Sequence, residues 1–150
     1  MTTRRSTPDP RAILRARDLL ARADTMAVHA GDVDDSTEQL RGLYLAALRA
    51  AGAALAVGEG STRRRGPASA WARLPRSLPA FTRWATYFAG LSRLRTDVEL
   101  GVVHDVPPAT IAFTRRAVVD FLADVEALVD ACAHGDVAPQ QWSRPDTRTA

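Results

Sequence analysis

The sequence of 150 residues has little of what several large classes of protein depend on. Its one cysteine, Cys132, excludes an internal disulfide and a cage of thiolate ligands for a metal. Its longest apolar run, from Ala50 to Val57, is far shorter than the roughly 18 residues that a membrane span requires. The basic residues near Met1 are not followed by the apolar stretch of an export signal. We therefore expect a cytoplasmic protein with no membrane partner.

Lysine is absent, and arginine supplies all 20 basic residues. This bias is typical of a GC-rich genome, such as that of an actinobacterium, so an arginine at a given position is weak evidence for a phosphate ligand. No group of histidines, cysteines and carboxylates has metal-ligand spacing, and no glycine-rich phosphate loop is present. We expect neither a metal nor another cofactor.

What the sequence does contain is enough apolar material for one core. Hydrophobic residues make up 46% of the chain and charged residues 25%, with a net charge of only +3, which excludes a disordered protein. Apolar residues follow helical spacing, and no alternating run is long enough for a strand. We predict an all-α, up-and-down bundle of four to five helices over residues 9–135. A disordered leader is expected at 1–8 and a disordered tail at 136–150.

Local signals mark where these helices begin and end. Asp9-Pro10 offers a cap and a first-turn proline, and Asp35 with Glu38 forms a capping box. Glycine or proline stands at most of the other boundaries. The expected helices cover residues 12–30, 36–57, 68–76, 79–100 and 108–134.

Two of the expected helices carry most of the core. The helix over 36–57 is apolar around much of its circumference, which predicts a central position in the bundle. The helix over 108–134 has one buried seam, with acidic residues on the opposite side. The seam consists of Ile111, Val118, Phe121, Leu122, Val125, Leu128, Val129 and Cys132.

Charge is unevenly distributed along the chain. Residues 61–76 contain five arginines and no acid, whereas residues 117–137 contain five acids and no base. The arginines are candidates for nucleic-acid binding, and Trp71, Trp84 and Tyr87 could stack on bases. The alternative is a solvated turn, with Trp71 and Trp84 in the core. The candidate arginines are Arg63, Arg64, Arg65, Arg73 and Arg76.

Four segments resemble a known family. They are Leu43-Tyr-Leu-Ala-Ala-Leu-Arg-Ala-Ala, Ser69-Ala-Trp-Ala-Arg-Leu, Phe88-Ala-Gly-Leu-Ser-Arg-Leu-Arg-Thr-Asp-Val-Glu-Leu-Gly and Ala117-Val-Val-Asp-Phe-Leu. Together they resemble the small, stand-alone, actinobacterial SAV-type HEPN domains over roughly residues 12–133. The resemblance implies a helical bundle that commonly forms dimers. In many HEPN members it also implies metal-independent RNA cleavage by an arginine followed, after four to six intervening residues, by a histidine.

The chain departs from that nuclease motif. Arg95 is followed at the fourth position by Glu99, and His104 comes only after eight intervening residues. Nine steps of about 100° would place Arg95 and His104 on opposite sides of an unbroken helix. Arg22 and His29 do have motif spacing, but about 1.2 such matches are expected by chance in a chain so rich in arginine.

Each candidate site residue has a structural alternative. Arg95 and Glu99 form either a phosphate-binding pair or, in our preferred interpretation, a salt bridge at a helix end. His104 is either a proton carrier or a loop residue beside Asp105, which would cap the next helix. For Cys132, inert packing is the interpretation that we favour.

Three hypotheses for function follow. The preferred one is a non-catalytic HEPN-like domain that binds RNA, a nucleotide or a protein partner. The second is a divergent ribonuclease using Arg95 with Glu99 or His104, and the third is a structural interaction module. We also predict a homodimer that has the helix over 79–100 near its interface and buries about 1,200–2,000 Å² in total.

Overall fold

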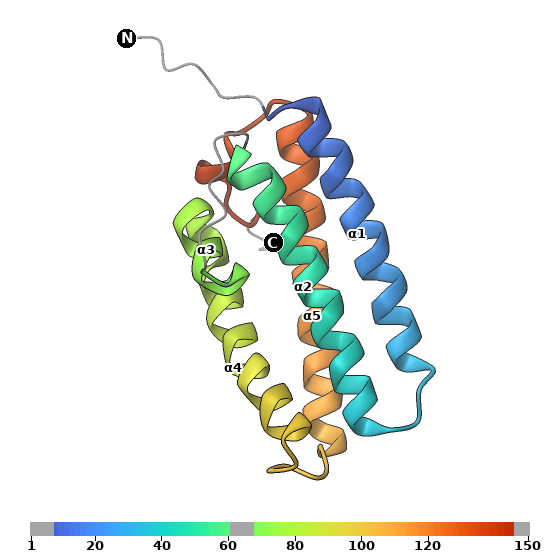
Figure 1. The fold of residues 1–150 in the computed structure, drawn as a ribbon. Coiled ribbons are helices and arrows are strands. Elements are labelled where there is room, and N and C mark those ends of the chain that lie inside the picture. Colours follow the sequence, from blue (N-terminus) through green and yellow to red (C-terminus); the bar gives the residue numbers. More distant parts are fainter. Residues whose placement is uncertain (1–7, 61–67, 146–150) are drawn as a thin grey trace, which may run out of the picture.

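The computed structural model describes residues 8–60 and 68–145. Four long helices run up and down in sequence, and no strand occurs in the two described stretches (Figure 1). The all-α bundle predicted from the sequence is therefore confirmed. The helices are α1 (Pro10–Gly31), α2 (Ser36–Gly58), α3 (Ala70–Ser77), α4 (Thr82–Glu99) and α5 (Pro108–Ala133), with short 3-10 turns at Pro79–Phe81 and Pro139–Gln141.

The helix ends lie close to the predicted positions because their signals are local. The Asp9 carboxylate accepts a hydrogen bond from the backbone N–H of Arg11, and the Asp35 carboxylate accepts one from that of Glu38. Ser69 caps α3 in the same way, so α3 begins two residues later than expected. Each cap satisfies an N–H group that has no partner inside the helix.

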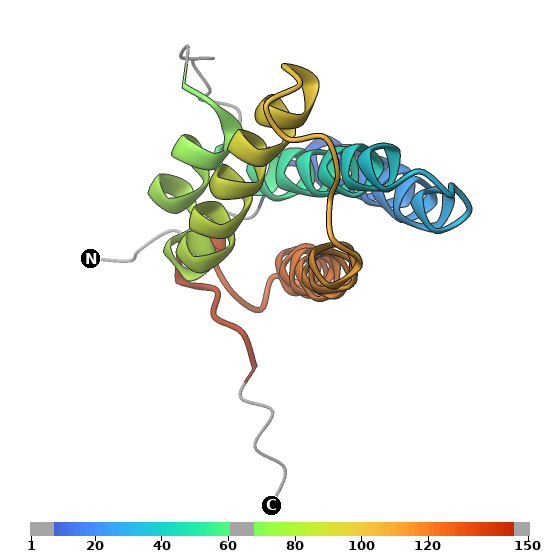
Figure 2. The same cartoon turned by 90° about the horizontal axis from the view of Figure 1, so that it is seen from below.

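Helix α2 occupies the centre of the bundle, between α1 and the α3–α4 arm and in front of α5 (Figures 1 and 2). Small residues let α1 and α2 approach closely, since a Cβ atom on Gly42 would lie 3.1 Å from that of Ala30. By length and composition α2 could also cross a membrane, but 61% of its apolar window is buried inside the bundle. That burial is the one expected of a core helix.

Aromatic rings fill the space between α2, α3, α4 and α5. Trp71 stacks on Phe88 at 5.1 Å between ring centroids, and Phe88 in turn packs against Phe121 at 5.0 Å. The indole N–H of Trp71 donates to the hydroxyl of Tyr44 over 3.1 Å. Trp71 is therefore the anchor of the short helix α3, as the structural alternative predicted.

The acidic residues of α5 are not all on its solvent side. Asp124 is 8% exposed, accepts a hydrogen bond from the indole N–H of Trp84 over 2.9 Å, and lies 3.3 Å from Arg144. The expected separation of seam and acids is therefore wrong at this position. A buried carboxylate is tolerated there because one of its oxygens accepts a hydrogen bond and the other has a cation beside it.

The expected tail also needs correction, because residues 139–142 pack on the bundle. Trp142 is 7% exposed and stacks on Phe81 at 5.1 Å between ring centroids. Beside it, the amide of Gln140 donates to the backbone carbonyl of Gly58 over 3.1 Å. The large apolar area of an indole is the physical reason that this segment is held against the core.

Candidate nucleic-acid interface

Arg95 is held mainly by an aromatic ring. Its guanidinium lies over Tyr44, with Cζ 4.7 Å from the ring centroid. The nearest Glu99 oxygen is 3.9 Å from Nε, which is within ion-pair range but too long for a hydrogen bond. The Nε atom itself is buried and has no hydrogen-bond partner. The predicted ion pair exists, yet the contact with Tyr44 does more to fix the side chain.

His104 and Asp105 lie in the exposed loop between α4 and α5. The Asp105 carboxylate accepts a hydrogen bond from the hydroxyl of Ser36 over 3.1 Å, which ties this loop to the start of α2. Helix α5 has no side-chain cap, so the expectation that Asp105 caps it is wrong. Among the described residues, no hydrogen bond or ion pair brings His104 to Arg95 or Glu99.

The predicted arginine cluster is only partly within the described chain. Arg63, Arg64 and Arg65 lie outside it. Arg73 makes a two-pronged contact with Glu59, at 2.6 and 3.0 Å, and this hydrogen bonding raises the pKa of the guanidinium. The charge of Arg73 is therefore already neutralised by Glu59, through a bidentate contact between a guanidinium and a carboxylate.

Arg76, the remaining member of the predicted cluster, is exposed near the end of α3. It is therefore the one candidate in the described chain that presents a solvent-facing guanidinium without the strong pairing seen at Arg73.

A different surface brings cations and aromatic rings together. A groove of about 540 Å³ lies between α4 and α5, and we call it the aromatic groove. Phe113, on its α5 side, is 63% exposed, and its ring centroid is 5.7 Å from that of Tyr87 on α4. The residues lining the groove are Thr82, Arg83, Trp84, Thr86, Tyr87, Phe113, Arg116, Ala117 and Asp120.

Hydrogen bonds across α4 and α5 fix two of these rings. The Tyr87 hydroxyl donates to that of buried Thr114 over 3.2 Å, and the Trp84 indole donates to Asp124. Both polar ends point into the protein, which leaves ring faces for the groove. Arg83 and Arg116 are exposed, one on each wall. The arrangement offers planar surfaces for stacking beside donors for an anion.

Sequence reasoning found only part of this groove. The sequence indicates Trp84 and Tyr87 as stacking residues, but it does not single out Phe113, Arg83 or Arg116. The one available signal was that Phe113 falls outside the apolar seam of its helix, so its ring had to lie elsewhere than in the core. Nothing in the sequence placed it opposite Tyr87.

The remaining reactive side chains have structural roles. His134 Nδ1 donates to the Asp130 carbonyl over 2.7 Å, which closes the end of α5. Cys132 is fully buried, and desolvation raises the pKa of its thiol to about 11, so it packs as an inert group. Within residues 8–60 and 68–145, no three potential metal ligands come together.

Comparison with known proteins identifies a family. The family described as SAV_6107-like HEPN matches residues 30–126, which is more than half of the chain and includes α2, α3, α4 and most of α5. Among curated proteins and among solved structures nothing matches. The matched region includes every residue of the aromatic groove.

Proposed function

Because the chain belongs to the SAV_6107-like HEPN family, we propose that it binds single-stranded RNA without cleaving it. The observation that carries this proposal is the aromatic groove, where three rings line one open surface between two exposed arginines. Bases are planar and stack on aromatic rings, whereas the phosphates between them need cations. The groove supplies both within one short stretch of α4 and α5.

The absence of cleavage in this proposal rests on how Arg95 and His104 are placed. The nuclease pair that the HEPN resemblance implies needs a guanidinium on the scissile phosphate and an imidazole within reach of the attacking hydroxyl. Here the guanidinium of Arg95 rests on Tyr44, and His104 lies in a loop tied to Ser36 through its neighbour Asp105. These separate contacts, and the lack of any hydrogen bond or ion pair between the two side chains among the described residues, together support binding without cleavage.

In the proposed complex, one base stacks on the exposed ring of Phe113, beside Tyr87. Base stacking on an aromatic side chain contributes about 1–3 kcal/mol per base and tolerates any sequence. Arg83 and Arg116 would contact the phosphates on either side, and Asp120 disfavours a more extended polyanion along the same wall. The groove therefore suits a few nucleotides of a single strand better than a duplex, whose bases are hidden from it.

The test is the affinity of the purified protein for a fluorescent, eight-nucleotide uridine oligomer, measured by anisotropy at several salt concentrations. Phe113→Ala removes about 1–3 kcal/mol of stacking, which is a loss of roughly fivefold to more than a hundredfold in affinity. Arg83→Gln with Arg116→Gln should reduce the slope of log affinity against log salt by about 1.4, since each phosphate contact on a single strand contributes about 0.7.

Arg41→Gln is the matched control, because Arg41 is an exposed arginine of α2 that does not line the groove. It should leave both affinity and salt slope nearly unchanged. Equal losses in Arg41→Gln and in the groove variants would contradict the proposal, as would an unchanged affinity in Phe113→Ala. Preference for a duplex over the single strand would also overturn it.

A further inference from the structure

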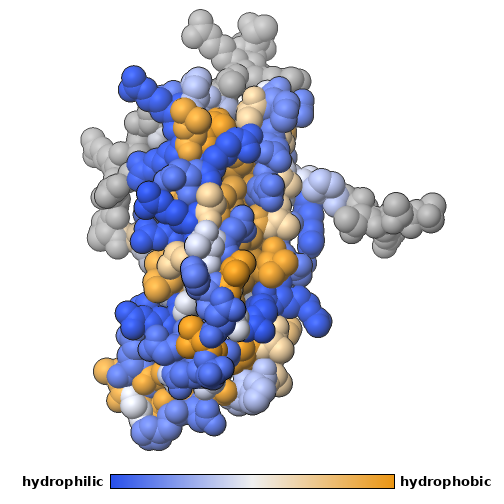
Figure 3. Space-filling view, turned by 90° about the vertical axis from the view of Figure 1, so that its right-hand side faces the viewer, coloured by the Kyte–Doolittle hydropathy of each residue, from blue (hydrophilic) through white to orange (hydrophobic). Residues whose placement is uncertain are grey.

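A second groove lies between α1 and α2 and ends at α3. Its volume is about 590 Å³, and Arg15 of α1, Arg49 of α2 and Arg73 of α3 stand at its walls. On the face that carries α1, apolar side chains are exposed between hydrophilic ones (Figure 3). We call this surface the α1–α2 groove. Its aliphatic lining consists of Leu19, Leu45, Leu48, Leu55, Ala56 and Ala70.

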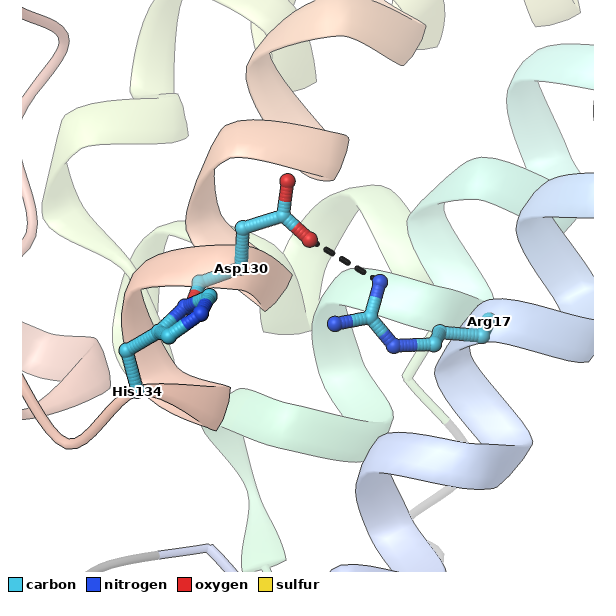
Figure 4. A network of polar contacts seen from close by, with 3 residues as sticks. All are labelled: Arg17, Asp130 and His134. Carbon is cyan, nitrogen blue, oxygen red and sulfur yellow. Dashed lines mark hydrogen bonds and ion pairs between the residues drawn. The ribbon is translucent and has the colours of Figure 1, made fainter.

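Two of the three arginines in this groove are exposed and have no acidic partner. No ion pair or side-chain hydrogen bond to Arg15 or Arg49 occurs within residues 8–60 and 68–145. Arginines close by are paired instead. Arg17, on the side of α1 toward α5, lies 2.9 Å from Asp130 (Figure 4), and Arg73 has its bidentate contact with a carboxylate. The α1–α2 groove therefore keeps two cations available for acidic groups of a ligand.

Arg15 and Arg49 stand at opposite ends of an aliphatic centre. A Cβ atom on Gly52 would lie 3.6 Å from Cδ1 of Leu19, so these two residues are level with each other in the antiparallel helices α1 and α2 (Figure 1). Arg15 is four residues from Leu19, and Arg49 is three residues from Gly52 in the opposite direction along the bundle. At about 1.5 Å per residue, the two arginines start about 10 Å apart along the helix axes.

The groove continues along α1 beyond Arg49. A smaller hollow of about 370 Å³ also has Arg49 in its lining, together with Arg22 and Met26 of α1. From Arg15 to Met26 the helix rises about 16 Å, which is about three turns. Arg22 is paired with Asp18 at 3.2 Å, so it adds little free charge at this end. The surface is long enough for three turns of another helix laid along α1 and α2.

The spacing of the two cations also matches a helix. Residues seven positions apart on a helix lie about 10.5 Å apart on the same face, with the third and fourth positions between them. An extended strand would place residues of one face about 6.6 or 13 Å apart. The walls of the groove are themselves helices, so they have no free backbone edge to which a strand could bind. Gly52, with no side chain at the centre, lets the backbone of a bound helix approach.

We propose that the α1–α2 groove binds an amphipathic helix of another protein, with acidic residues seven positions apart and two aliphatic residues midway between them. One acid contacts Arg15 and the other contacts Arg49. The aliphatic side chains cover Leu19 and Gly52 and are removed from water, which is the main source of binding free energy. The α1–α2 groove shares no residue with the aromatic groove, so this activity is separate from RNA binding.

The lining distinguishes a helix from RNA as the ligand. Of the described residues that line the α1–α2 groove, none is aromatic, so a base would have no ring on which to stack. The aliphatic centre between the two cations instead matches an apolar stripe with acids at its ends. Complementary charge at the rim adds specificity and a dependence on salt.

The test uses a fluorescein-labelled, alanine-rich peptide of about 16 residues, which is long enough to hold helical structure. It carries two glutamates seven positions apart and two leucines midway. A control peptide of the same composition has its glutamates five positions apart, which places them on different faces of the helix. Fluorescence anisotropy should show saturable binding of the first peptide to the full chain and at least about tenfold weaker binding of the control.

Three variants test the groove itself. Arg15→Glu and Arg49→Glu should each weaken binding about fivefold to thirtyfold, because an attraction becomes a repulsion. Gly52→Leu fills the centre without changing the charge, and it should weaken binding at least about fivefold. Arg115→Glu is the matched control, since it makes the same charge change on an exposed residue of α5 outside the groove. It should leave the affinity nearly unchanged.

A charge exchange completes the test. The double variant of Arg15→Glu with Arg49→Glu should bind a peptide in which lysines replace the two glutamates, and wild type should not. Circular dichroism shows whether each variant is folded. The proposal is overturned by no saturable binding up to about 1 mM peptide, by equal affinity for the two glutamate peptides, or by an equal loss in Arg115→Glu.

RNA binding provides the last comparison. The affinity for the eight-nucleotide uridine oligomer should fall no further in Arg15→Glu and Arg49→Glu than in Arg115→Glu. A larger fall would assign the α1–α2 groove to nucleic acid and overturn the proposal. Because Phe113 and the α1–α2 groove are tested with separate variants and separate ligands, either proposal can fail alone.

Discussion

The guanidinium of Arg95 lies over the ring of Tyr44, with Cζ 4.7 Å from the ring centroid, and the hydroxyl of the same tyrosine accepts the indole N–H of Trp71. Tyr44 of α2 thus contacts Arg95 of α4 through its ring face and Trp71 of α3 through its hydroxyl group. The residue that the sequence singles out for chemistry is thereby engaged in packing. We therefore expect substitution of Arg95 to lower the free energy of unfolding.

We predict that Arg95→Met lowers the free energy of unfolding by about 1–2 kcal/mol, the range for a partly desolvated cation on an aromatic ring. Glu99→Gln should cost less than about 0.5 kcal/mol, because the Glu99 side chain is half exposed and its contact is long. Urea unfolding followed by circular dichroism measures both values. A Glu99→Gln variant as unstable as Arg95→Met would show instead that the ion pair dominates.

Purified protein should show no metal-independent cleavage of single-stranded or structured RNA above a mock purification. The reason is that the guanidinium of Arg95 is held on the ring of Tyr44, and that no described histidine lines the aromatic groove. Gel analysis of labelled RNA in the presence of a chelator tests this. Robust cleavage that is lost in both Arg95→Ala and His104→Ala would establish the divergent ribonuclease.

The arginine cluster of residues 61–76 also gives a prediction, although Arg63, Arg64 and Arg65 lie outside the described residues. Replacing these three with glutamine should flatten the salt dependence of RNA affinity by about 2 if they neutralise three phosphates. Arg73→Gln should add little to this flattening, since Glu59 already matches its charge. An unchanged slope in the triple variant would identify the segment as a solvated turn.

Asp35 should make stability depend on pH. Hydrogen bonds from the Thr37 hydroxyl and the Glu38 backbone hold the pKa of this carboxyl below its ordinary value of 3.8. The stabilisation from the charged cap is therefore complete above pH 3.8 and is lost as the pH falls through the lower folded value. Asp35→Asn keeps a capping oxygen but does not titrate. The gap in unfolding free energy between wild type and Asp35→Asn should shrink on acidification, and a constant gap would contradict the assignment.

Trp142→Ala should lower the free energy of unfolding by about 3 kcal/mol, near the value for a buried aromatic residue truncated to alanine. The loss comes from the stack on Phe81, which is fully buried. Arg144→Gln, two residues further on, should cost less than about 1 kcal/mol, because the Arg144 side chain is half exposed and Asp124 keeps the hydrogen bond from Trp84. Thermal unfolding of the two variants side by side separates packing from charge, and equal effects would show that the indole is not in the core.

Much of the fold was predictable because its causes are local. The Asp35 cap is formed within a few residues, and Phe121 and Val125 lie on a seam that repeats with the period of a helix. The HEPN resemblance was likewise carried by short segments, and the family comparison confirms it. The central position of α2 in the bundle was also predictable, because its apolar surface is too broad to be covered by one neighbouring helix.

The parts that were missed depend on contacts between distant residues. In the sequence Trp142 lies within a polar C-terminal segment, and only its contact with Phe81 shows that it is buried. Phe113 lies outside the apolar seam of its helix, and only the packing of α4 against α5 shows that its ring lies beside Tyr87. Asp124 fitted the acidic side of its helix, and only the indole of Trp84 explains its burial. Periodicity describes one helix at a time, so it carries no information on which two helices form a groove.

The three tryptophans of the chain lie in three different surroundings, and this has an optical consequence. Trp71 and Trp142 are buried against phenylalanine rings, whereas Trp84 is partly exposed in the aromatic groove. Intrinsic fluorescence is therefore expected to contain one component that a soluble quencher such as acrylamide reaches and two that it does not. A ligand that enters the groove should protect that one component, so occupancy can be followed without attaching a dye to the protein.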